Sequence, residues 1–259
     1  MRAEVRRLSD GRYGTAMFEQ VAIRVSDRAR SEQLYGTVLE VLEVSPSRRE
    51  EAAVEWDDLA MLAADREHPP TRHLHIGFLA PSREAVREFW RAGLQAGASS
   101  DGEPGERPQY TPGYYGAFLL DPDGNSIEAV IHDDVRCGGN IDHLWIGVGD
   151  LDASLAFYRT IARHTGLREG RVWDAGRQFR GARATFSLVA DGRPVTENLQ
   201  LAFPAPDHRT VQEFHRAATA AGYHDARAPG DRPRPDPGGY AACVLDPDGT
   251  RVESVALHG

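Results

Sequence analysis

Two strand-like segments of this 259-residue chain carry a histidine among apolar residues: His75 in HLHIGFLA (73–80) and His143 in IDHLWIGVGD (141–150). Two further segments place a glutamate, Glu128 or Glu253, shortly after a DPDG turn. Imidazole and carboxylate groups bind transition metals and can also transfer protons. An isolated histidine on an amphipathic strand is more often a hydrogen-bonded structural group. The residue types alone therefore leave a metal site and a structural role both open.

The composition excludes several other kinds of chemistry and partner. All 30 basic residues are arginine, so Schiff-base, pyridoxal-phosphate and P-loop chemistry, which need lysine, are excluded. The net charge of −9 argues against a nucleic-acid partner, and no apolar run reaches the roughly 18–20 residues of a membrane span. Only two cysteines, Cys137 and Cys243, are present, which is typical of a reducing compartment. We expect a cytoplasmic protein.

The chain contains an internal repeat. The tetrapeptide DPDG occurs at 121–124 and again 125 residues later, at 246–249. The same spacing relates other identical residues: Phe78 and Phe203, Phe89 and Phe214, Gly97 and Gly222, Gly105 and Gly230, Arg107 and Arg232, Tyr115 and Tyr240, and Glu128 and Glu253. The repeat predicts two similar domains at 17–134 and 141–259, joined by a linker at 135–140. Residues 1–16 are expected to form a flexible extension.

Each half contains the order strand, helix and short strands twice. The predicted helices are 28–42, 83–96, 151–165 and 209–221, and predicted strands include 21–25, 56–63, 144–148 and 184–190. The DPDG turn joins the last two strands of each half. The predicted fold class is therefore α+β, with four βαβββ modules. A doubly wound parallel sheet would instead alternate strands and helices one for one.

The segment at 75–132 resembles the second module of small glyoxalase/bleomycin-resistance proteins, and 141–158 resembles the first module of the same family. The chain is thus similar to a tandem member of the vicinal oxygen chelate superfamily, which includes extradiol dioxygenases, over nearly all of 17–258. The resemblance implies two tandem glyoxalase-like domains. It selects no reaction, because lyases, isomerases, dioxygenases, transferases and metal-free drug binders share the fold.

The resemblance also implies a set of metal ligands. In the family, a site draws on the first strands of two modules and on the glutamate after the last turn. The corresponding residues are Gln20, His75 and Glu128 in the first half, and His143, Gln200 and Glu253 in the second. If the halves exchange ligands, as in the family's swapped arrangement, His75, Glu128 and His143 form a complete site and the other three a degenerate one. The complete set suits one divalent transition metal: Fe(II), Zn, Ni or Mn.

Aromatic residues near the predicted site are candidates for contact with a substrate. These are Tyr110, Tyr114, Tyr115 and Phe118, and Tyr115 is also a candidate catalytic residue beside Glu128. His73 shares a strand face with His75 and is an alternative ligand.

Several other prominent side chains are expected in the core, in the scaffold or at the surface. Trp145 is expected to point into the core, away from His143. Arg107 and Arg232 are expected to have the same scaffold role, since the repeat places them identically. His132, His208 and His215 are expected at the surface.

Individual members of the superfamily match the chain incompletely. Extradiol dioxygenases place a tyrosine ten residues before the metal glutamate, where this chain has Phe118 and Cys243. Glyoxalase I suggests a second way of sharing ligands, from Gln20, Glu128, His143 and Glu253. Fosfomycin-type transferases carry a lysine/serine pattern that this chain lacks.

The predicted function is that of a metal-dependent enzyme acting on a small oxygenated substrate that chelates the metal, as a lyase, isomerase or dioxygenase. The alternative is a metal-free antibiotic- or small-molecule-binding protein of the bleomycin-resistance type. A monomer or a homodimer is expected, because the tandem fusion supplies internally the pairing that single-unit relatives obtain by dimerising.

Overall fold

The computed structural model describes residues 17–133, 139–181, 184–232 and 239–257. The predicted extension and most of the predicted linker lie outside the described residues. The chain forms four consecutive βαβββ modules, which confirms the predicted fold class. The first two modules comprise β1 Gln20–Val25, α1 Arg28–Val41, β2 Arg48–Arg49, β3 Ala53–Trp56, β4 Leu59–Ala63, β5 Leu74–Leu79, α2 Arg83–Gln95, β6 Ser99–Glu106, β7 Tyr115–Leu120 and β8 Ser126–Ile131. The last two comprise β9 Ile141–Gly147, α3 Leu151–Thr165, β10 Arg168–Trp173, β11 Gly176–Arg180, β12 Thr185–Val189, β13 Gln200–Pro204, α4 His208–Ala220, β14 Asp225–Asp231, β15 Tyr240–Leu245 and β16 Arg251–Ala256.

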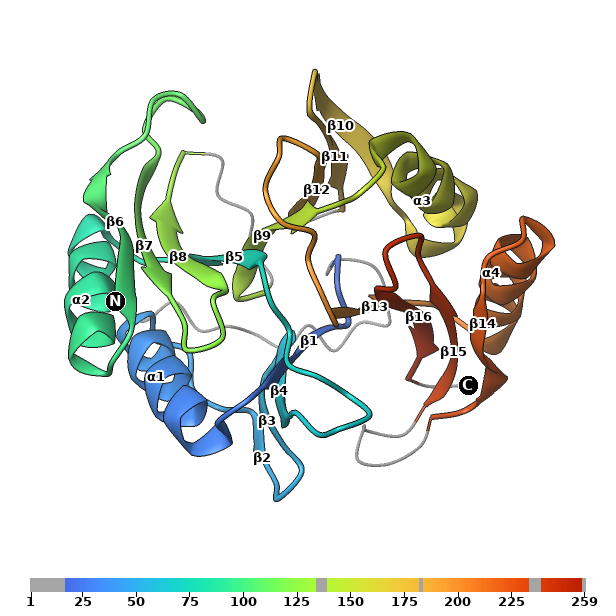
Figure 1. The fold of residues 1–259 in the computed structure, drawn as a ribbon, viewed down its shortest axis with the longest axis horizontal. Helices are drawn as coiled ribbons and strands as arrows, with labels where there is room; N and C mark the ends of the chain where they lie inside the picture. Colours follow the sequence, from blue (N-terminus) through green and yellow to red (C-terminus); the bar gives the residue numbers. More distant parts are fainter. Residues whose placement is uncertain (1–16, 134–138, 182–183, 233–238, 258–259) are drawn as a thin grey trace.

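The two sequence halves exchange modules. One eight-stranded sheet has the order β14-β15-β16-β13-β1-β4-β3-β2 and so combines the first and fourth modules; we call it the outer-module sheet. The other, β10-β11-β12-β9-β5-β8-β7-β6, combines the second and third modules and is called the inner-module sheet. The antiparallel pairs β1–β13 and β5–β9 join the halves at the centre of each sheet. Each sheet therefore contains strands from both halves of the chain (Figure 1).

The four helices begin at acidic or hydroxyl caps. Asp27, Ser82, Asp150 and Asp207 each accept a hydrogen bond from a backbone N–H in the first turn of the helix that follows. Helices α1 and α2 pack together, as do α3 and α4, at opposite ends of the molecule (Figure 1). Their apolar faces cover the sheets and leave the other sheet faces free to carry polar groups.

The two DPDG turns are built alike. Asp121 Oδ1 accepts the N–H groups of Asp123 and Asn125, at 2.9 and 2.8 Å, and Tyr35 donates its hydroxyl to Asp121 Oδ2 at 2.9 Å. Asp246 repeats this arrangement with Asp248, Thr250 and Tyr158 in the other sheet. Gly124 and Gly249 have φ values of 85° and 87°, which a glycine adopts without strain. The repeated sequence thus marks a repeated turn that connects the last two strands of each half of the chain, β7 to β8 and β15 to β16.

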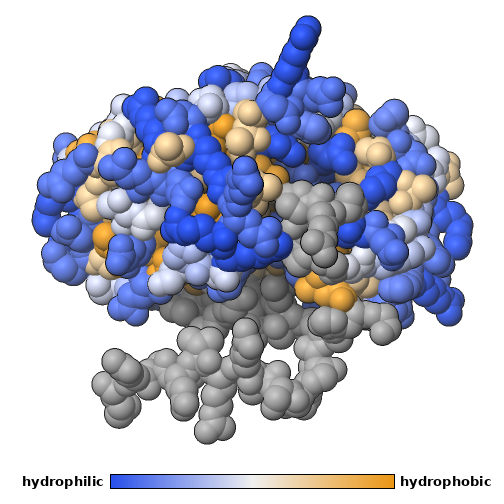
Figure 2. Space-filling model, turned by 90° about the horizontal axis from the view of Figure 1, so that it is seen from below, coloured by the Kyte–Doolittle hydropathy of each residue, from blue (hydrophilic) through white to orange (hydrophobic). Residues whose placement is uncertain are grey.

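Apolar side chains of both halves form one large buried cluster, which includes Trp56, Phe78, Phe186 and Phe203. One predicted strand is wrong in detail. The segment at 56–63 is interrupted, because β3 ends at Trp56 and β4 begins at Leu59, with Asp57 in the left-handed region at φ 53°. On the face seen in Figure 2, away from the grey atoms, hydrophobic residues form small patches among hydrophilic ones. None of the described helices is long and apolar enough to cross a membrane.

Candidate metal centre

The inner-module sheet brings together three side chains from its central strands: His75 of β5, Glu128 of β8 and His143 of β9. Their positions follow from the register, since Gly77 of β5 pairs with Glu128 on one side and with His143 on the other. A Cβ atom at Gly77 would lie 2.3 Å from His143 Cε1. At Gly116 of β7, a Cβ would lie 2.4 Å from Glu128 Oε1. The two glycines therefore make the space in which the His143 ring and the Glu128 carboxylate converge.

The converging atoms have the spacing of metal ligands. His75 Nε2 lies 3.1 Å from Glu128 Oε2 and 3.1 Å from His143 Nε2, and His143 Nε2 lies 3.2 Å from Glu128 Oε2. Two ligands at right angles around a metal, with bonds of about 2.0–2.2 Å, are separated by about 3.0 Å. In the described part of the chain, these residues are the group whose donor atoms meet within 4.8 Å.

A second layer of hydrogen bonds directs both Nε2 atoms toward the centre. Ser126 donates its hydroxyl to Asp101 Oδ2 at 2.7 Å, so the 3.1 Å contact with His75 Nδ1 leaves the imidazole as the donor. His143 Nδ1 lies 2.8 Å from Asp142 Oδ2, a carboxylate that accepts hydrogen bonds when ionised. Each ring thus has its proton on Nδ1 and offers the Nε2 lone pair inward. Together with Glu128, three acceptor atoms meet at one point, which fits a bound cation.

The remaining oxygen of Glu128 is also held in place. Tyr114 donates its hydroxyl to Glu128 Oε1 at 2.7 Å, which leaves Oε2 facing the histidines. Burial and the neighbouring carboxylate raise the pKa of Tyr114 well above its usual range, so its hydroxyl remains a donor. The ring of Tyr114 stacks on His132 with centroids 5.7 Å apart. Tyr114 therefore connects Glu128 to the hydrogen-bonded group around His143.

The charges in the group depend on one another. Burial by itself raises the pKa of Glu128, but the side-chain contacts with His143 and His75 outweigh it and lower that pKa. Burial lowers the pKa of His75. Burial acts the same way on His143, yet Asp142 and Glu128 raise its pKa to about 9. One proton thus balances Glu128 when no metal is bound, and a divalent cation would release that proton on binding.

A β-bulge explains why sequence reasoning missed Asp142. Regular alternation would point Asp142 away from His143. However, consecutive residues of β5 pair with residues of β9 that are two apart: Gly77 pairs with His143 and Phe78 pairs with Ile141. Asp142 of β9 is therefore an extra residue in the ladder. Bulges redirect side chains in this way. Asp142 Oδ2 meets His143 Nδ1, and Asp142 Oδ1 lies 3.1 Å from His132 Nε2.

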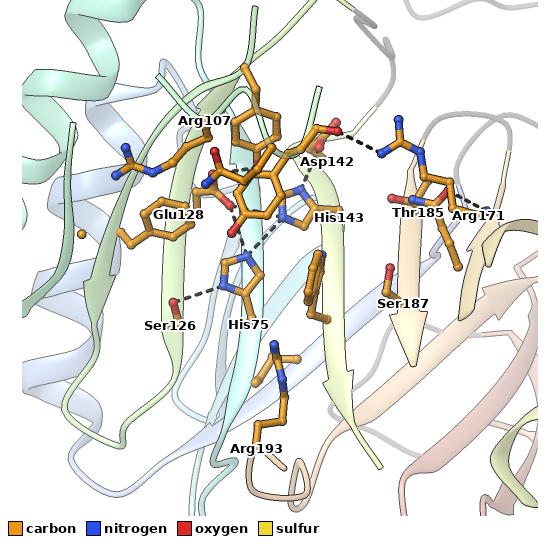
Figure 3. Close-up of a pocket in the computed structure, with 18 of the residues that line it drawn as sticks. His75, Arg107, Ser126, Glu128, Asp142, His143, Arg171, Thr185, Ser187 and Arg193 are labelled. Atoms are coloured by element: carbon orange, nitrogen blue, oxygen red, sulfur yellow. Dashed lines mark hydrogen bonds and ion pairs between the residues drawn. The ribbon is translucent and has the colours of Figure 1, made fainter. Parts of the chain in front are cut away.

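His75, Glu128 and His143, the candidate metal-ligand group, face a cavity of about 1160 Å³ on the inner-module sheet (Figure 3). Among the predicted substrate contacts, Tyr110, Tyr114 and Phe118 line it, and the Phe118 ring lies 5.9 Å from His75. Tyr115 does not line it, so the structure does not bring this candidate catalytic residue to the site. Alternation along β7 points Tyr115 toward α2, where Arg87 donates to its hydroxyl at 3.3 Å.

Three further expectations are corrected. Trp145 lines the cavity with its ring 6.3 Å from His75, because residues two apart on a strand share a face. His132 is buried beside Asp142 and is not a surface residue. His73 precedes β5 at φ 60° and lines the cavity, but does not join the ligand group. The other two histidines fit the expectation loosely: His208 is exposed, and His215 is half-buried beside Asp225.

The equivalent place in the outer-module sheet contains an arginine. Ala202 of β13 pairs with Gln20 of β1 and with Glu253 of β16, just as Gly77 pairs with its neighbours. Arg232 Nη2 lies 3.2 Å from Glu253 Oε2 and donates to Gln20 Oε1 at 3.4 Å. Arg227 donates to Glu253 Oε1 at 3.1 Å. Guanidinium groups thus neutralise the buried glutamate.

Arg232 and its repeat equivalent therefore differ, contrary to the expectation of a shared role. The Arg107 guanidinium lies 5.5 Å from the centre of the Phe118 ring and donates to the backbone oxygens of Glu103 and Glu106, leaving Glu128 to the histidines. Gln200 begins β13, half-buried. The alternative ligand set drawn from Gln20, Glu128, His143 and Glu253 is wrong, because its members lie in two different sheets.

Comparisons with known proteins agree with this architecture. Residues 18–129 and 140–254 both match the family model of the Glyoxalase/Bleomycin resistance protein/Dioxygenase superfamily. The chain belongs to this superfamily. Glyoxalase I from Zea mays is similar in structure, with a TM-score of 0.66 and 19% identity over 93% of this chain and 92% of that one. A putative dioxygenase from Bacillus subtilis has a TM-score of 0.64 and 14% identity, over 95% and 87% of the chains. Identities this low establish a common superfamily fold and not a common reaction. No curated protein sequence matches the chain.

Proposed function

We propose that this protein is a metal-dependent enzyme whose His75, Glu128 and His143 hold one divalent transition metal in the inner-module sheet. Its substrate would be a small molecule with neighbouring oxygen atoms that complete the coordination of the metal. The observation that carries the proposal is the convergence of three acceptor atoms, at 3.1–3.2 Å from one another, in a buried setting. Such a group is unfavourable unless a proton or a cation lies among its members.

The ligand types suit Fe(II), Zn, Ni or Mn. Two neutral imidazoles and one carboxylate leave coordination positions open, and a bound metal would act as a Lewis acid toward substrate oxygens. The protein's own residues prepare the site for this chemistry. Asp142 and Ser126 orient the two imidazoles. Tyr114 donates its hydroxyl to Glu128 Oε1 and so leaves Oε2 as the ligand atom.

The surrounding residues would bind and enclose the substrate. Tyr110, Trp145 and Trp173 form one wall of the cavity, with the Trp145 ring 6.1 Å from that of Tyr110 and 6.0 Å from that of Trp173. Phe118 lies on the other side of His75. The hydroxyl-bearing residues Thr185 and Ser187 line the same cavity (Figure 3). Aromatic walls exclude water and strengthen electrostatic interactions with the metal-bound part of a substrate.

The deciding measurement is the metal content per chain of untagged protein, determined by elemental analysis after loading with each candidate metal. About one equivalent is expected for wild type, and a large loss for His75→Ala and His143→Ala. Gln200→Ala is the matched control, because Gln200 has the repeat position of His75 in the other sheet. Metal retained in His75→Ala and His143→Ala would place the ion elsewhere. If wild type takes up no metal, the proposal fails and the metal-free small-molecule binder is favoured.

A further inference from the structure

The cavity beside the metal-ligand group has an excess of positive charge. Four arginines line it: Arg107, Arg171, Arg180 and Arg193. Figure 3 shows three of them, Arg107, Arg171 and Arg193, on different sides of the histidines. The acidic residues of the lining are already engaged, since Glu128 and Asp142 contact the histidines and Asp101 accepts the hydroxyl of Ser126. This excess occurs in a protein with a net charge of −9.

Three of the four arginines of the cavity lack a carboxylate partner. Arg193 is paired with Asp191 at 2.8 Å. No carboxylate in the described part of the chain lies within the 4.0 Å of an ion pair from Arg107, Arg171 or Arg180. Their hydrogen bonds go to neutral groups: Arg171 Nη1 donates to Tyr110 O at 3.0 Å, and Arg180 Nε donates to Gln178 Oε1 at 3.0 Å.

Two of these arginines form a pair on one hairpin. Arg171 lies on β10 and Arg180 on β11, and Gln178 lies between them. Gln178 Oε1 accepts the backbone N–H of Arg171 at 3.4 Å as well as Nε of Arg180. Neither Nη atom of Arg180, and only one of Arg171, is used in these bonds. The hairpin therefore presents several unused N–H donors at the cavity mouth.

The hairpin of the outer-module sheet lacks this feature. Its arginines are Arg48 and Arg49 on β2, and both are ion-paired: Arg48 with Glu50 and Glu55, and Arg49 with Glu32. The first module thus neutralises its hairpin internally. The third module leaves its hairpin charged, and does so beside the cavity that holds the candidate ligands.

Aromatic surface adjoins the unpaired arginines. Trp173 lies two residues after Arg171, both line the cavity, and the Trp173 ring is 6.0 Å from that of Trp145. Tyr110, whose backbone oxygen accepts from Arg171, is 37% exposed and has its ring 6.1 Å from Trp145. A flat apolar surface and guanidinium forks therefore meet at one end of the cavity.

We propose that the cavity takes an organic anion: a carboxylate that carries an aromatic or similarly planar group. The ring would pack against Trp145, Trp173 and Tyr110, and the carboxylate would be bound by Arg171 and Arg180, since guanidinium groups match carboxylates in charge and geometry. The local positive charge would concentrate such an anion despite the negative charge of the whole protein. This inference rests on the proposed function, in that the cavity is the substrate site, and adds the class of substrate.

The test separates the arginines from the metal by using metal-free protein. Calorimetric titrations would compare 2-naphthoate with 2-naphthylmethanol, a neutral compound with the same ring system, in buffers of low salt. The naphthoate is expected to bind at least about tenfold more tightly than the alcohol. Arg171→Gln and Arg180→Gln should each weaken naphthoate binding about five- to tenfold and leave alcohol binding nearly unchanged. Added salt should weaken only the naphthoate.

Arg49→Gln is the matched control, because it makes the same change in net charge on the other hairpin. Equal binding of the two probes, an equal effect of Arg49→Gln, or the absence of saturable naphthoate binding would each overturn the inference. The metal content of the same variants keeps the two proposals apart. Arginine-dependent naphthoate binding in a protein that takes up no metal would support this inference and reject the proposed enzyme.

Discussion

The two sheets treat the same buried glutamate in opposite ways. Glu128 and Glu253 occupy equivalent repeat positions, and each is 1% exposed. In the outer-module sheet, Arg232 and Arg227 supply the opposing positive charge. In the inner-module sheet, two histidines face the glutamate and the equivalent arginine, Arg107, stays at the Phe118 ring. A buried carboxylate requires a balancing positive charge. Two arginines supply it in the outer-module sheet, whereas in the inner-module sheet it comes from a proton on the histidines or, as we propose, from a metal ion.

A second difference lies in the space around the glutamates. Gly77 and Gly116 make room for His143 and Glu128, and the residues at the same repeat positions in the outer-module sheet are Ala202 and Ala241. Ala202 lies between Gln20 and Glu253, as Gly77 lies between the ligands. One sheet is thus shaped to admit an imidazole and the other is not. The sheet with the histidine pair therefore also has the space for it.

The largest expected effect concerns the charge balance of the outer-module sheet. Arg232→Ala would leave Glu253 short of its buried partner, and we expect the free energy of unfolding to fall by about 3 kcal/mol. Arg107→Ala, at the repeat position in the other sheet, should change it by less than about 1 kcal/mol. Urea denaturation of both variants measures the difference. Equal losses would contradict the distinction between the two arginines.

The next prediction concerns the space for the ligands. Gly77→Ala places a methyl group where the His143 ring lies, 2.3 Å from Cε1, so the ring must move. We expect metal affinity to fall by about 10- to 100-fold, a range that holds for other disturbances of ligand orientation. A competition titration with a chelating dye would measure it. Ala202→Gly, the reciprocal change in the outer-module sheet, should leave metal affinity unaltered.

A smaller effect is expected for the bulged carboxylate. Asp142→Asn keeps the size of the side chain but removes the charge that holds the proton on His143 Nδ1, so metal affinity should fall by about tenfold. The pKa of His143, raised to about 9 by Asp142 and Glu128 against the effect of burial, should also fall in the metal-free protein. Proton NMR titration of the imidazole follows that change. An unaltered pKa would show that Asp142 does not control the ring.

The last prediction concerns a feature common to both sheets, the aspartate of the DPDG turn. Burial raises the pKa of Asp246 to about 6, so the folded protein binds this proton more tightly than the unfolded chain does. The resulting stability is complete below about pH 4 and is lost as the pH rises through about 6, by at most about 1.4 kcal/mol for each pH unit. Asp246→Asn should reduce this dependence in urea denaturation between pH 4 and 7 and leave the part that comes from Asp121 and Asp58, whose pKa values burial also raises. A wild-type-like pH profile in the variant would exclude Asp246 as its source.

Much of the fold was predictable because its determinants are local. Helix caps, glycine-terminated helices and the two DPDG turns mark the four modules in the sequence, and the structure has the same order of elements. The sequence did not predict the two-residue turn after Trp56, because the residues on both sides of this turn are apolar and look like one continuous strand. Strict alternation along the strands places Tyr115 of β7 and Trp145 of β9 on the faces that the structure shows, so the sequence already contains the information for both side chains.

Other features were decided only by the folded chain. Asp142 reaches His143 because β9 carries a bulge, and a bulge depends on the pairing of two strands that are distant in sequence. Whether the equivalent arginine contacts the glutamate depends on which residue of the neighbouring strand lies beside that glutamate. This residue is Gln20 in one sheet and His143 in the other, and only the folded chain shows it. The repeat and the ligand types were properties of the sequence. Which modules share a sheet was decided by the long-range strand pairing between β1 and β13 and between β5 and β9. This pairing also decides how the six residues divide into two unlike sites.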